Sequence, residues 1–217
     1  MFVGHLAVGF AAKRVAPKTS LGTLLIAAQL PDVLWAMFLI TGIEHARIVP
    51  GITAASPLDL YDFPLSHSLL MDIVWAGFAA GLYWRVRRYA RGAWVVFAAV
   101  LSHWALDFLS HRPDMPLAPG LATKFGLGVW NSIPLTYAVE GGLWLIGIAV
   151  YLRVTSAKDR MGTYAFWPMI AVLTAIWIGS VGGTPPPSMQ VVAVGNLIVA
   201  TVFAWAYWID RHRPVRV

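Results

Sequence analysis

Residues 92–111, GAWVVFAAVLSHWALDFLSH, decide the fold. The stretch has the length of a membrane-crossing helix, because about 20 apolar residues span the hydrocarbon core of a bilayer. His103, Asp107 and His111 recur at every fourth position, which places them on one stripe of such a helix. Ionisable side chains are expensive inside a membrane, so three on one stripe require an explanation. Imidazole and carboxylate are ligands of zinc-like cations, so we predict metal or proton chemistry; a polar stripe hydrogen-bonded to neighbouring helices is the alternative.

The composition places the whole chain in a membrane. Of its 217 residues, 59% are hydrophobic and 12% charged, and the mean hydropathy is +0.68. Charged residues make up about a quarter of an average soluble domain, so the chain has roughly half the usual share. Cysteine is absent from the sequence, which excludes disulfides and thiolate metal ligands. The N-terminus lacks a basic region followed by a cleavage site, so we expect no removed signal peptide.

Hydropathy predicts an all-α polytopic membrane bundle. Residues 2–12 are apolar but too short to cross, which predicts an N-terminal half-helix. Six transmembrane helices are predicted at residues 21–41, 64–84, 92–111, 129–152, 164–181 and 191–209. Residues 42–63 and 112–128 are predicted to be loops. We expect one integral membrane domain over residues 1–217, with polar motifs in residues 1–145 and accessory helices in residues 146–217.

Lysines and arginines predict the orientation of the bundle. Of these residues, 13 of 16 fall before the first span, between spans two and three, between spans four and five, or in the tail. The positive-inside rule makes this side cytoplasmic, together with both termini. The net charge of +6 then reflects topology, and no nucleic-acid partner is expected.

Ionisable residues on different spans fall at one level of the membrane. At about 1.5 Å per residue, Asp32, His67, His103, Asp107 and Glu140 lie about 18 to 27 Å from their cytoplasmic anchors. This is the outer half of a hydrocarbon core about 30 Å thick. Lipid-facing positions would not tolerate these groups, so we expect them to meet inside the bundle.

Two of the candidate ligands have alternative interpretations. His5 lies only about 12 to 14 Å above the nearest basic residues, so it reaches the others only if the half-helix is tilted or partly unwound. It could equally be a packing histidine. Asp32 follows Pro31, which removes a backbone donor, so its carboxylate is either a ligand or an acceptor for the frayed turn.

Two further carboxylates have roles that the sequence leaves open. On a continuous helix Asp72 lies about 140° around from His67, so the two cannot share a face. We therefore take His67 as the ligand candidate, and Asp72 as structural or as a support for a ligand. Glu140 could ligate a metal, act as a general base or orient a ligand histidine.

One known family shares the order of these motifs, which are His5, Pro31 with Asp32, Ser66-His67-Ser68, Ser102-His103, Asp107, His111 and Glu140. In residues 1–145 the chain resembles the YdjM-type family of bacterial inner-membrane proteins. That family is described as predicted metal-dependent hydrolases and is also labelled LexA-binding, for which the residues themselves give no argument. The motif order is also similar to that of the zinc-dependent phospholipase C and single-strand nuclease superfamily.

The resemblance implies a site with one or two metal ions, zinc by analogy. Its ligands would be His5, Asp32, His67, His103, Asp107 and His111, with Asp107 bridging two ions. The soluble superfamily also uses a processed N-terminal Trp and a later His-x3-Asp pair, and neither has a match here. Catalytic roles would fall to Asp32 or Glu140 as the base. Arg112 would pair with a substrate phosphate, or is simply a solvated loop arginine.

These observations favour a multi-pass metal-dependent hydrolase of the bacterial inner membrane. Its expected partners are bilayer lipids, and a site in the outer half of the bilayer would suit a phospholipid or lipid-linked phosphoester. The alternative is a divalent cation or proton carrier that uses the same groups. A third interpretation is a structural membrane protein whose polar groups only hold helices together.

Overall fold

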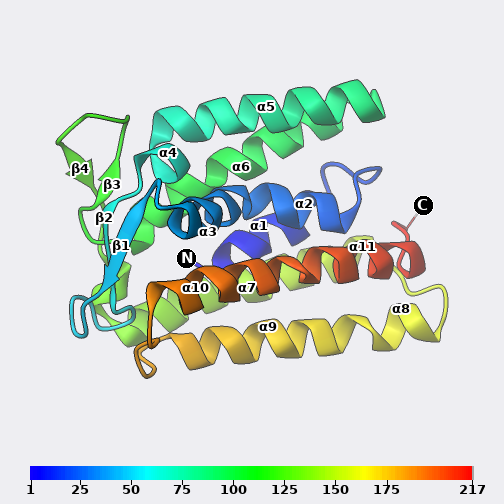
Figure 1. The fold of residues 1–217 in the computed structure, drawn as a ribbon. Coiled ribbons are helices and arrows are strands. Elements are labelled where there is room, and N and C mark those ends of the chain that lie inside the picture. The colour runs from blue at the N-terminus through cyan, green and yellow to red at the C-terminus, as the bar shows by residue number, and fades with distance from the viewer. Residues whose placement is uncertain (217) are drawn as a thin grey trace.

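Long helices run side by side and carry the chain back and forth between two ends of the molecule (Figure 1). The computed structural model describes residues 1–216. Its longest helices are α5 (Leu69–Arg87), α6 (Ala90–Ser110), α7 (Ile133–Val154) and α9 (Phe166–Ser180). Shorter ones are α1 (Val3–Ala12), α2 (Leu21–Ala28), α3 (Leu30–Thr41), α4 (Pro64–His67), α8 (Arg160–Tyr164), α10 (Met189–Ala200) and α11 (Val202–His212), with a 3-10 turn at Val129–Asn131.

The helices confirm the predicted membrane bundle. Within residues 1–216, five helical segments are long and apolar enough to cross a membrane, or six if α2 and α3 are counted as one bent span. The apolar α1 is too short to cross, as expected for a half-helix. Loops rich in lysine and arginine gather at the end of the bundle where α5 ends and the chain terminates (Figure 1). Which side of the membrane this end faces stays a prediction.

Two of the predicted spans are broken beside candidate ligands. The α2 and α3 axes differ by 58°, with Gln29 between them and a proline in the first turn of α3. Proline supplies no N–H to the preceding turn, so the helical hydrogen bonds stop there. The second break is at Ser68, whose extended backbone ends α4 and whose hydroxyl caps α5 by accepting from Met71 N–H.

Helix α1 lies inside the bundle rather than against lipid. Eight of its ten residues are buried, and it packs against α2, α6 and α7. Its contact with α7 is close because Gly147 has no side chain, and a Cβ there would lie 2.6 to 2.9 Å from atoms of Ala7. This packing holds a helix that could not cross a bilayer by itself.

Gly147→Ala is therefore expected to destabilise the protein by about 1 to 3 kcal/mol, the usual cost of overpacking a core. Gly142→Ala in the same helix is the control, because a Cβ there meets nothing within 4 Å. The control should leave the unfolding temperature in detergent unchanged or raise it slightly, since alanine favours helix over glycine. Equal unfolding temperatures for the two variants would contradict the close packing of α1 on α7.

Both predicted outer loops contain short β-hairpins. Strand β1 (His45–Ile48) pairs antiparallel with β2 (Leu58–Asp62), and β3 (Met115–Pro116) pairs with β4 (Lys124–Phe125). The prediction of plain loops over residues 42–63 and 112–128 was wrong in this detail. The hairpins lie at the end of the bundle opposite the basic loops, beside the start of α4 and the end of α6 (Figure 1).

Candidate metal centre

Asp107, one turn before the end of α6, lies at the centre of a buried group of histidines. Its Oδ1 lies 3.0 Å from His5 Nε2 and 3.6 Å from His111 Nε2. Its Oδ2 lies 3.2 Å from His103 Nε2 and 3.7 Å from His67 Nε2. The two carboxylate oxygens thus face two different pairs of imidazoles, as the carboxylate of a bridging ligand would.

Asp32 completes this group from the first turn of α3. Its Oδ1 lies 3.5 Å from His67 Nε2 and 3.8 Å from His103 Nε2. The structure thus brings together all six predicted metal ligands, from four helices and the C-cap of α6, and we call them the His/Asp cluster: His5, Asp32, His67, His103, Asp107 and His111. Two triads have ligand atoms within 4.8 Å of one another, namely His5, His103 and Asp107, and Asp32, His67 and His103.

Three of the histidines are fixed in orientation by hydrogen bonds at Nδ1, the ring nitrogen that does not face Asp107. His103 Nδ1 lies 2.9 Å from the carbonyl oxygen of Ala28, at the break between α2 and α3. His111 Nδ1 lies 3.0 Å from Asp114 Oδ1. Because a carbonyl or carboxylate can only accept, each Nδ1 carries a proton, and when the ring is neutral its Nε2 presents a lone pair to the cluster.

His67 is held by a longer chain of hydrogen bonds. Its Nδ1 lies 2.7 Å from Ser66 Oγ, and this hydroxyl donates to Glu44 Oε2 at 2.5 Å. The other oxygen of Glu44 accepts the backbone N–H groups of Leu65 and Ser66. Glu44 therefore caps the short helix α4 and fixes the His67 ring together with it.

The donor set fits a divalent cation. Imidazole lone pairs aimed at carboxylate oxygens repel one another unless a positive charge lies between them. His103 is completely buried, and its Nε2 makes no hydrogen bond within residues 1–216 although it faces Asp107. An unpartnered buried nitrogen of this kind is what a metal ligand presents when its proton is on the other nitrogen. The residues can thus hold a metal ion, and nitrogen and carboxylate oxygen are ligands that zinc accepts.

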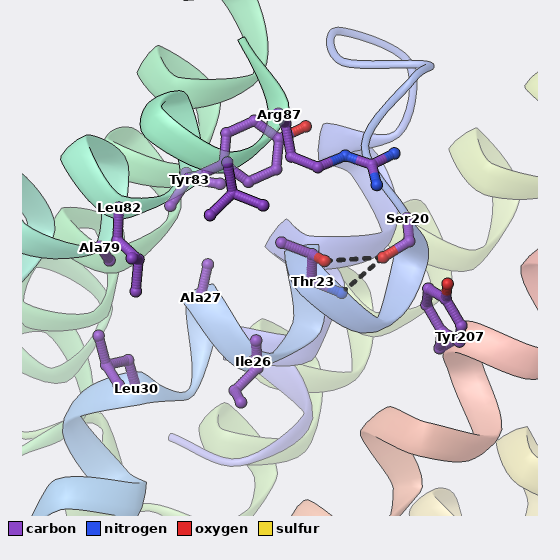
Figure 2. Close-up of a pocket in the computed structure, with 12 residues that line it drawn as sticks. Ser20, Thr23, Ile26, Ala27, Leu30, Ala79, Leu82, Tyr83, Arg87 and Tyr207 are labelled. Carbon is purple, nitrogen blue, oxygen red and sulfur yellow. Dashed lines mark hydrogen bonds between the residues drawn. The ribbon is translucent and has the colours of Figure 1, made fainter. Parts of the chain in front are cut away.

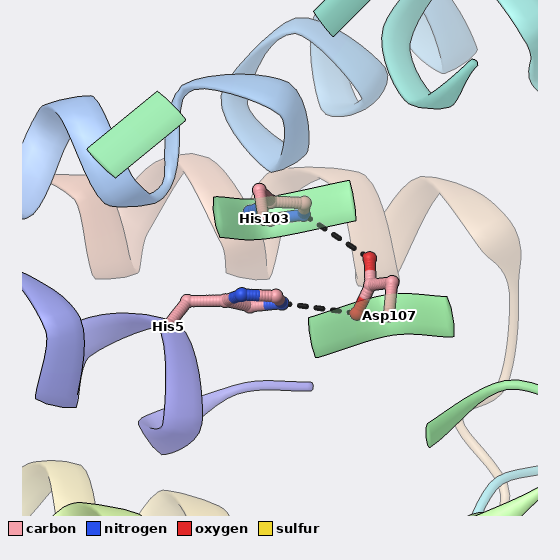
Figure 3. A group of neighbouring side chains, drawn as sticks. All are labelled: His5, His103 and Asp107. Carbon is pink, nitrogen blue, oxygen red and sulfur yellow. Dashed lines mark hydrogen bonds and ion pairs between the residues drawn. The ribbon is translucent and has the colours of Figure 1, made fainter. Parts of the chain in front are cut away.

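His5 reaches the cluster through the burial of α1. Its ring stacks on that of His103, with centroids 3.6 Å apart and planes 8° from parallel. Figure 3 shows the two parallel rings, both directed at Asp107. The α-amino group of Met1 also contacts Asp107 Oδ1. Of the two interpretations of His5, the structure therefore supports membership of the cluster.

Two sequence arguments about helical faces need correction. Helix α6 ends at Ser110, so His111 is its C-cap with an extended backbone and does not continue the helical stripe. It stays near Asp107 because its own N–H still bonds the Asp107 carbonyl at 2.8 Å. The predicted angle between His67 and Asp72 requires one continuous helix, and the break at Ser68 interrupts that helix. Asp72 is fully buried and belongs to neither triad.

Glu140 and Arg112, predicted to be catalytic and substrate-binding, are engaged elsewhere. Glu140 Oε1 accepts the backbone N–H groups of Phe2 and Gly4, so this carboxylate caps the N-terminus of α1. Arg112 forms ion pairs with Asp59 in β2 and with Asp114, the partner of His111. Both residues therefore lie beside the cluster, and their predicted roles in catalysis and substrate binding stay predictions.

The side chains that hydrogen-bond to Nδ1 of the histidines were not among the predicted site residues. Asp114 follows His111 by three residues, a spacing that could have signalled a pair. Ser66 precedes His67, and Ser102 precedes His103, yet the two serines differ in the structure. Ser102 donates to the carbonyl of Ala99 in its own helix at 2.7 Å, and only Ser66 bonds its neighbouring histidine.

This difference gives a matched pair of variants. Ser66→Ala removes the hydroxyl that links His67 to Glu44. It should weaken metal affinity by about 10- to 100-fold, the usual cost of losing a hydrogen bond to a metal ligand. Ser102→Ala removes a hydroxyl beside a ligand without touching the ring, and should leave affinity unchanged. Titration of metal into chelator-treated protein measures both. An equal loss in both variants would contradict the role given to Ser66.

Fold and site together define a polytopic membrane protein with a buried His/Asp cluster able to hold a metal ion. Among known families, the sequence profile of the YdjM inner membrane protein family matches residues 1–208. The chain belongs to this family, and the match confirms the resemblance and a multi-pass location in the inner membrane. The matched range runs beyond residue 145, where the recognisable motifs ended. No curated protein matches the chain, and no solved structure does either.

Proposed function

We propose that the protein is a metal-dependent hydrolase of the inner membrane that cleaves a lipid or lipid-linked phosphoester. The observation that carries the proposal is a cavity of about 430 Å³ that reaches the His/Asp cluster. Asp32, His67, Asp107 and His111 line it. Asp32 is the most exposed of these side chains, at 19%, while His67, Asp107 and His111 are nearly covered. A substrate group in the cavity would therefore meet Asp32 first.

The remaining walls of the cavity favour a substrate with a hydrocarbon tail. Away from the cluster the cavity runs between α3, α9 and α10. Val191, Gly195 and Val199, spaced four residues apart on one face of α10, line it together with Ile176 of α9. The cavity thus has a polar end at the cluster and an apolar passage between membrane helices. This shape suits a substrate with a phosphoester headgroup and a lipid tail.

In this proposal, metal binding and proton transfer are assigned to different residues. A zinc ion, if bound there, would supply a water of lowered pKa, near 7, and would polarise the phosphoryl oxygen. Asp107 and the histidines would hold the ion, while the buried side chains of Asp114 and Ser66 fix the rings of His111 and His67. Asp32 accepts the proton of the attacking water, because its carboxylate is both in the cluster and open to the cavity.

The test combines metal analysis with an activity assay. Protein purified without chelator should contain close to one or two equivalents of metal, and less than about a tenth of an equivalent of zinc, manganese or iron would refute the proposal. The same preparation should hydrolyse a long-chain phosphoester in mixed micelles. Metal uptake into liposomes without hydrolysis would instead favour the cation carrier.

Two tryptophan variants on α10 test the lipid part of the proposal. Val191 lines the cavity, whereas Val194 is a similarly exposed valine on α10 outside it. Val191→Trp should slow cleavage of the long-chain substrate but spare a short-chain analogue, and Val194→Trp should spare both. Equal cleavage of the long-chain substrate by both variants would contradict the proposed tail path.

A further inference from the structure

A second cavity lies at the opposite end of the bundle from the His/Asp cluster. Its volume is about 350 Å³, and it lies between α2, α5, α6 and α11. It is close to the basic loops, since Arg87 in the last turn of α5 and Ser20 before α2 both line it. Figure 2 shows the cavity with its lining side chains. The proposed hydrolytic site makes no use of it.

The lining divides into a polar and an apolar side. In Figure 2, Ser20, Thr23, Tyr207 and the guanidinium end of Arg87 lie on one side. The other side is apolar and is formed by Ala27, Leu30, Ala79 and Leu82 (Figure 2). Leu82 is 54% exposed and Ile26 at the lower edge 43%, so the apolar side opens toward the surface that faces lipid.

The polar side carries an unneutralised positive charge. Within residues 1–216 the lysine and arginine ion pairs involve Lys13, Arg47 and Arg112, and none involves Arg87. Tyr207 Oη accepts from Arg211 at 3.1 Å, which leaves its own proton free to donate. Ser20 Oγ accepts from Thr23 N–H at 3.1 Å, and the two hydroxyls bond each other at 2.7 Å. One hydroxyl proton of this pair is also free to donate.

We propose that this cavity binds one anionic phospholipid. The headgroup phosphate would accept from Arg87, Tyr207 and the Ser20–Thr23 hydroxyl pair, because a guanidinium and neutral hydroxyls are donors that suit phosphate. One acyl chain would lie along Leu30, Ala79 and Leu82. The occupant is a lipid rather than free phosphate because the donors and the apolar wall share one cavity that opens to the bilayer.

The experiment compares lipid retention by two arginine variants. The full-length protein is reconstituted with equal amounts of phosphatidylglycerol and phosphatidylcholine, and lipid bound after detergent extraction is quantified by mass spectrometry. Arg87→Gln is expected to lower the preference for phosphatidylglycerol about fivefold, as expected for one arginine at an anionic headgroup. Arg85→Gln is the control, since Arg85 lies in the same turn of α5 but outside the cavity. The control should keep the preference of the unmodified protein.

Two further measurements make the result decisive. Ala79→Trp fills the apolar side, and should reduce retention of long-chain phosphatidylglycerol while the arginine remains in place. Inorganic phosphate should fail to displace the lipid at millimolar concentration. Equal losses in Arg87→Gln and Arg85→Gln would overturn the proposal in favour of general charge attraction. Displacement by inorganic phosphate would overturn it in favour of a phosphate site.

Discussion

Asp107→Asn is expected to release the metal ion and abolish hydrolysis. The substitution keeps the size of the side chain but removes the negative charge between four imidazoles, and its amide nitrogen cannot coordinate a cation. Substitution of a residue that hydrogen-bonds to a metal ligand costs about 10- to 100-fold in affinity, so loss of the carboxylate that faces four imidazoles should cost more than about 100-fold. Metal content after purification and activity on the phosphoester substrate measure the effect.

Asp72→Asn is the matched control for this variant. Asp72 is as buried as Asp107, and its oxygens make no hydrogen bond within residues 1–216. Asp72 belongs to neither triad of the cluster. The metal content of the Asp72→Asn variant should therefore stay near that of the unmodified protein. If Asp72→Asn released the metal and Asp107→Asn retained it, the central position assigned to Asp107 would be wrong.

Removal of the metal is expected to lower the unfolding temperature markedly. Without a cation, the buried carboxylates of Asp32 and Asp107 have only the α-amino group of Met1 and the imidazoles as partners, which leaves their two negative charges incompletely compensated. An ion that binds only the folded protein, at a concentration about a thousandfold above its dissociation constant, adds about 4 kcal/mol of stability. Thermal unfolding in detergent should therefore fall after treatment with a chelator and recover when zinc is added.

The same treatment of the Asp107→Asn variant separates metal binding from side effects of the chelator. That variant has no metal to lose, so its unfolding temperature should not respond. The Asp72→Asn variant should respond like the unmodified protein. A chelator response in Asp107→Asn equal to that of the unmodified protein would show that the stabilising ion is bound elsewhere.

The membrane bundle and most of the cluster were predictable from sequence for physical reasons. Apolar runs of bilayer length have one stable arrangement in lipid, which is helical. Ionisable side chains in such runs must turn inward and meet, and Asp32, His67, His103 and Asp107 do so. Counting residues along helices sufficed for these positions because helices have a fixed rise.

The groups that support the cluster by hydrogen bonds were not predictable in the same way. Ala28 offers its carbonyl to His103 because α2 and α3 bend by 58°, and neither the size nor the direction of a bend follows from a proline alone. Glu44 reaches Ser66 from a loop that hydropathy describes only as polar. Glu140 holds the N-terminus of α1, a contact across 138 positions of the chain. Such contacts depend on how segments pack, which periodicity does not encode.

The burial of α1 also predicts an order in which parts of the protein assemble. Residues 3–12 leave the ribosome before the helices that enclose them, yet they cannot rest in the bilayer alone, because ten residues do not span it. Their partners come late: His5 contacts Asp107 across 102 positions, and the cap from Glu140 lies further on. We therefore expect the N-terminal segment to stay at the membrane surface until α6 and α7 have been inserted, and then to pack against them. The His/Asp cluster is thus expected to be complete only after α7 has been inserted, and newly made chains would pass through a stage that is embedded but lacks the full cluster.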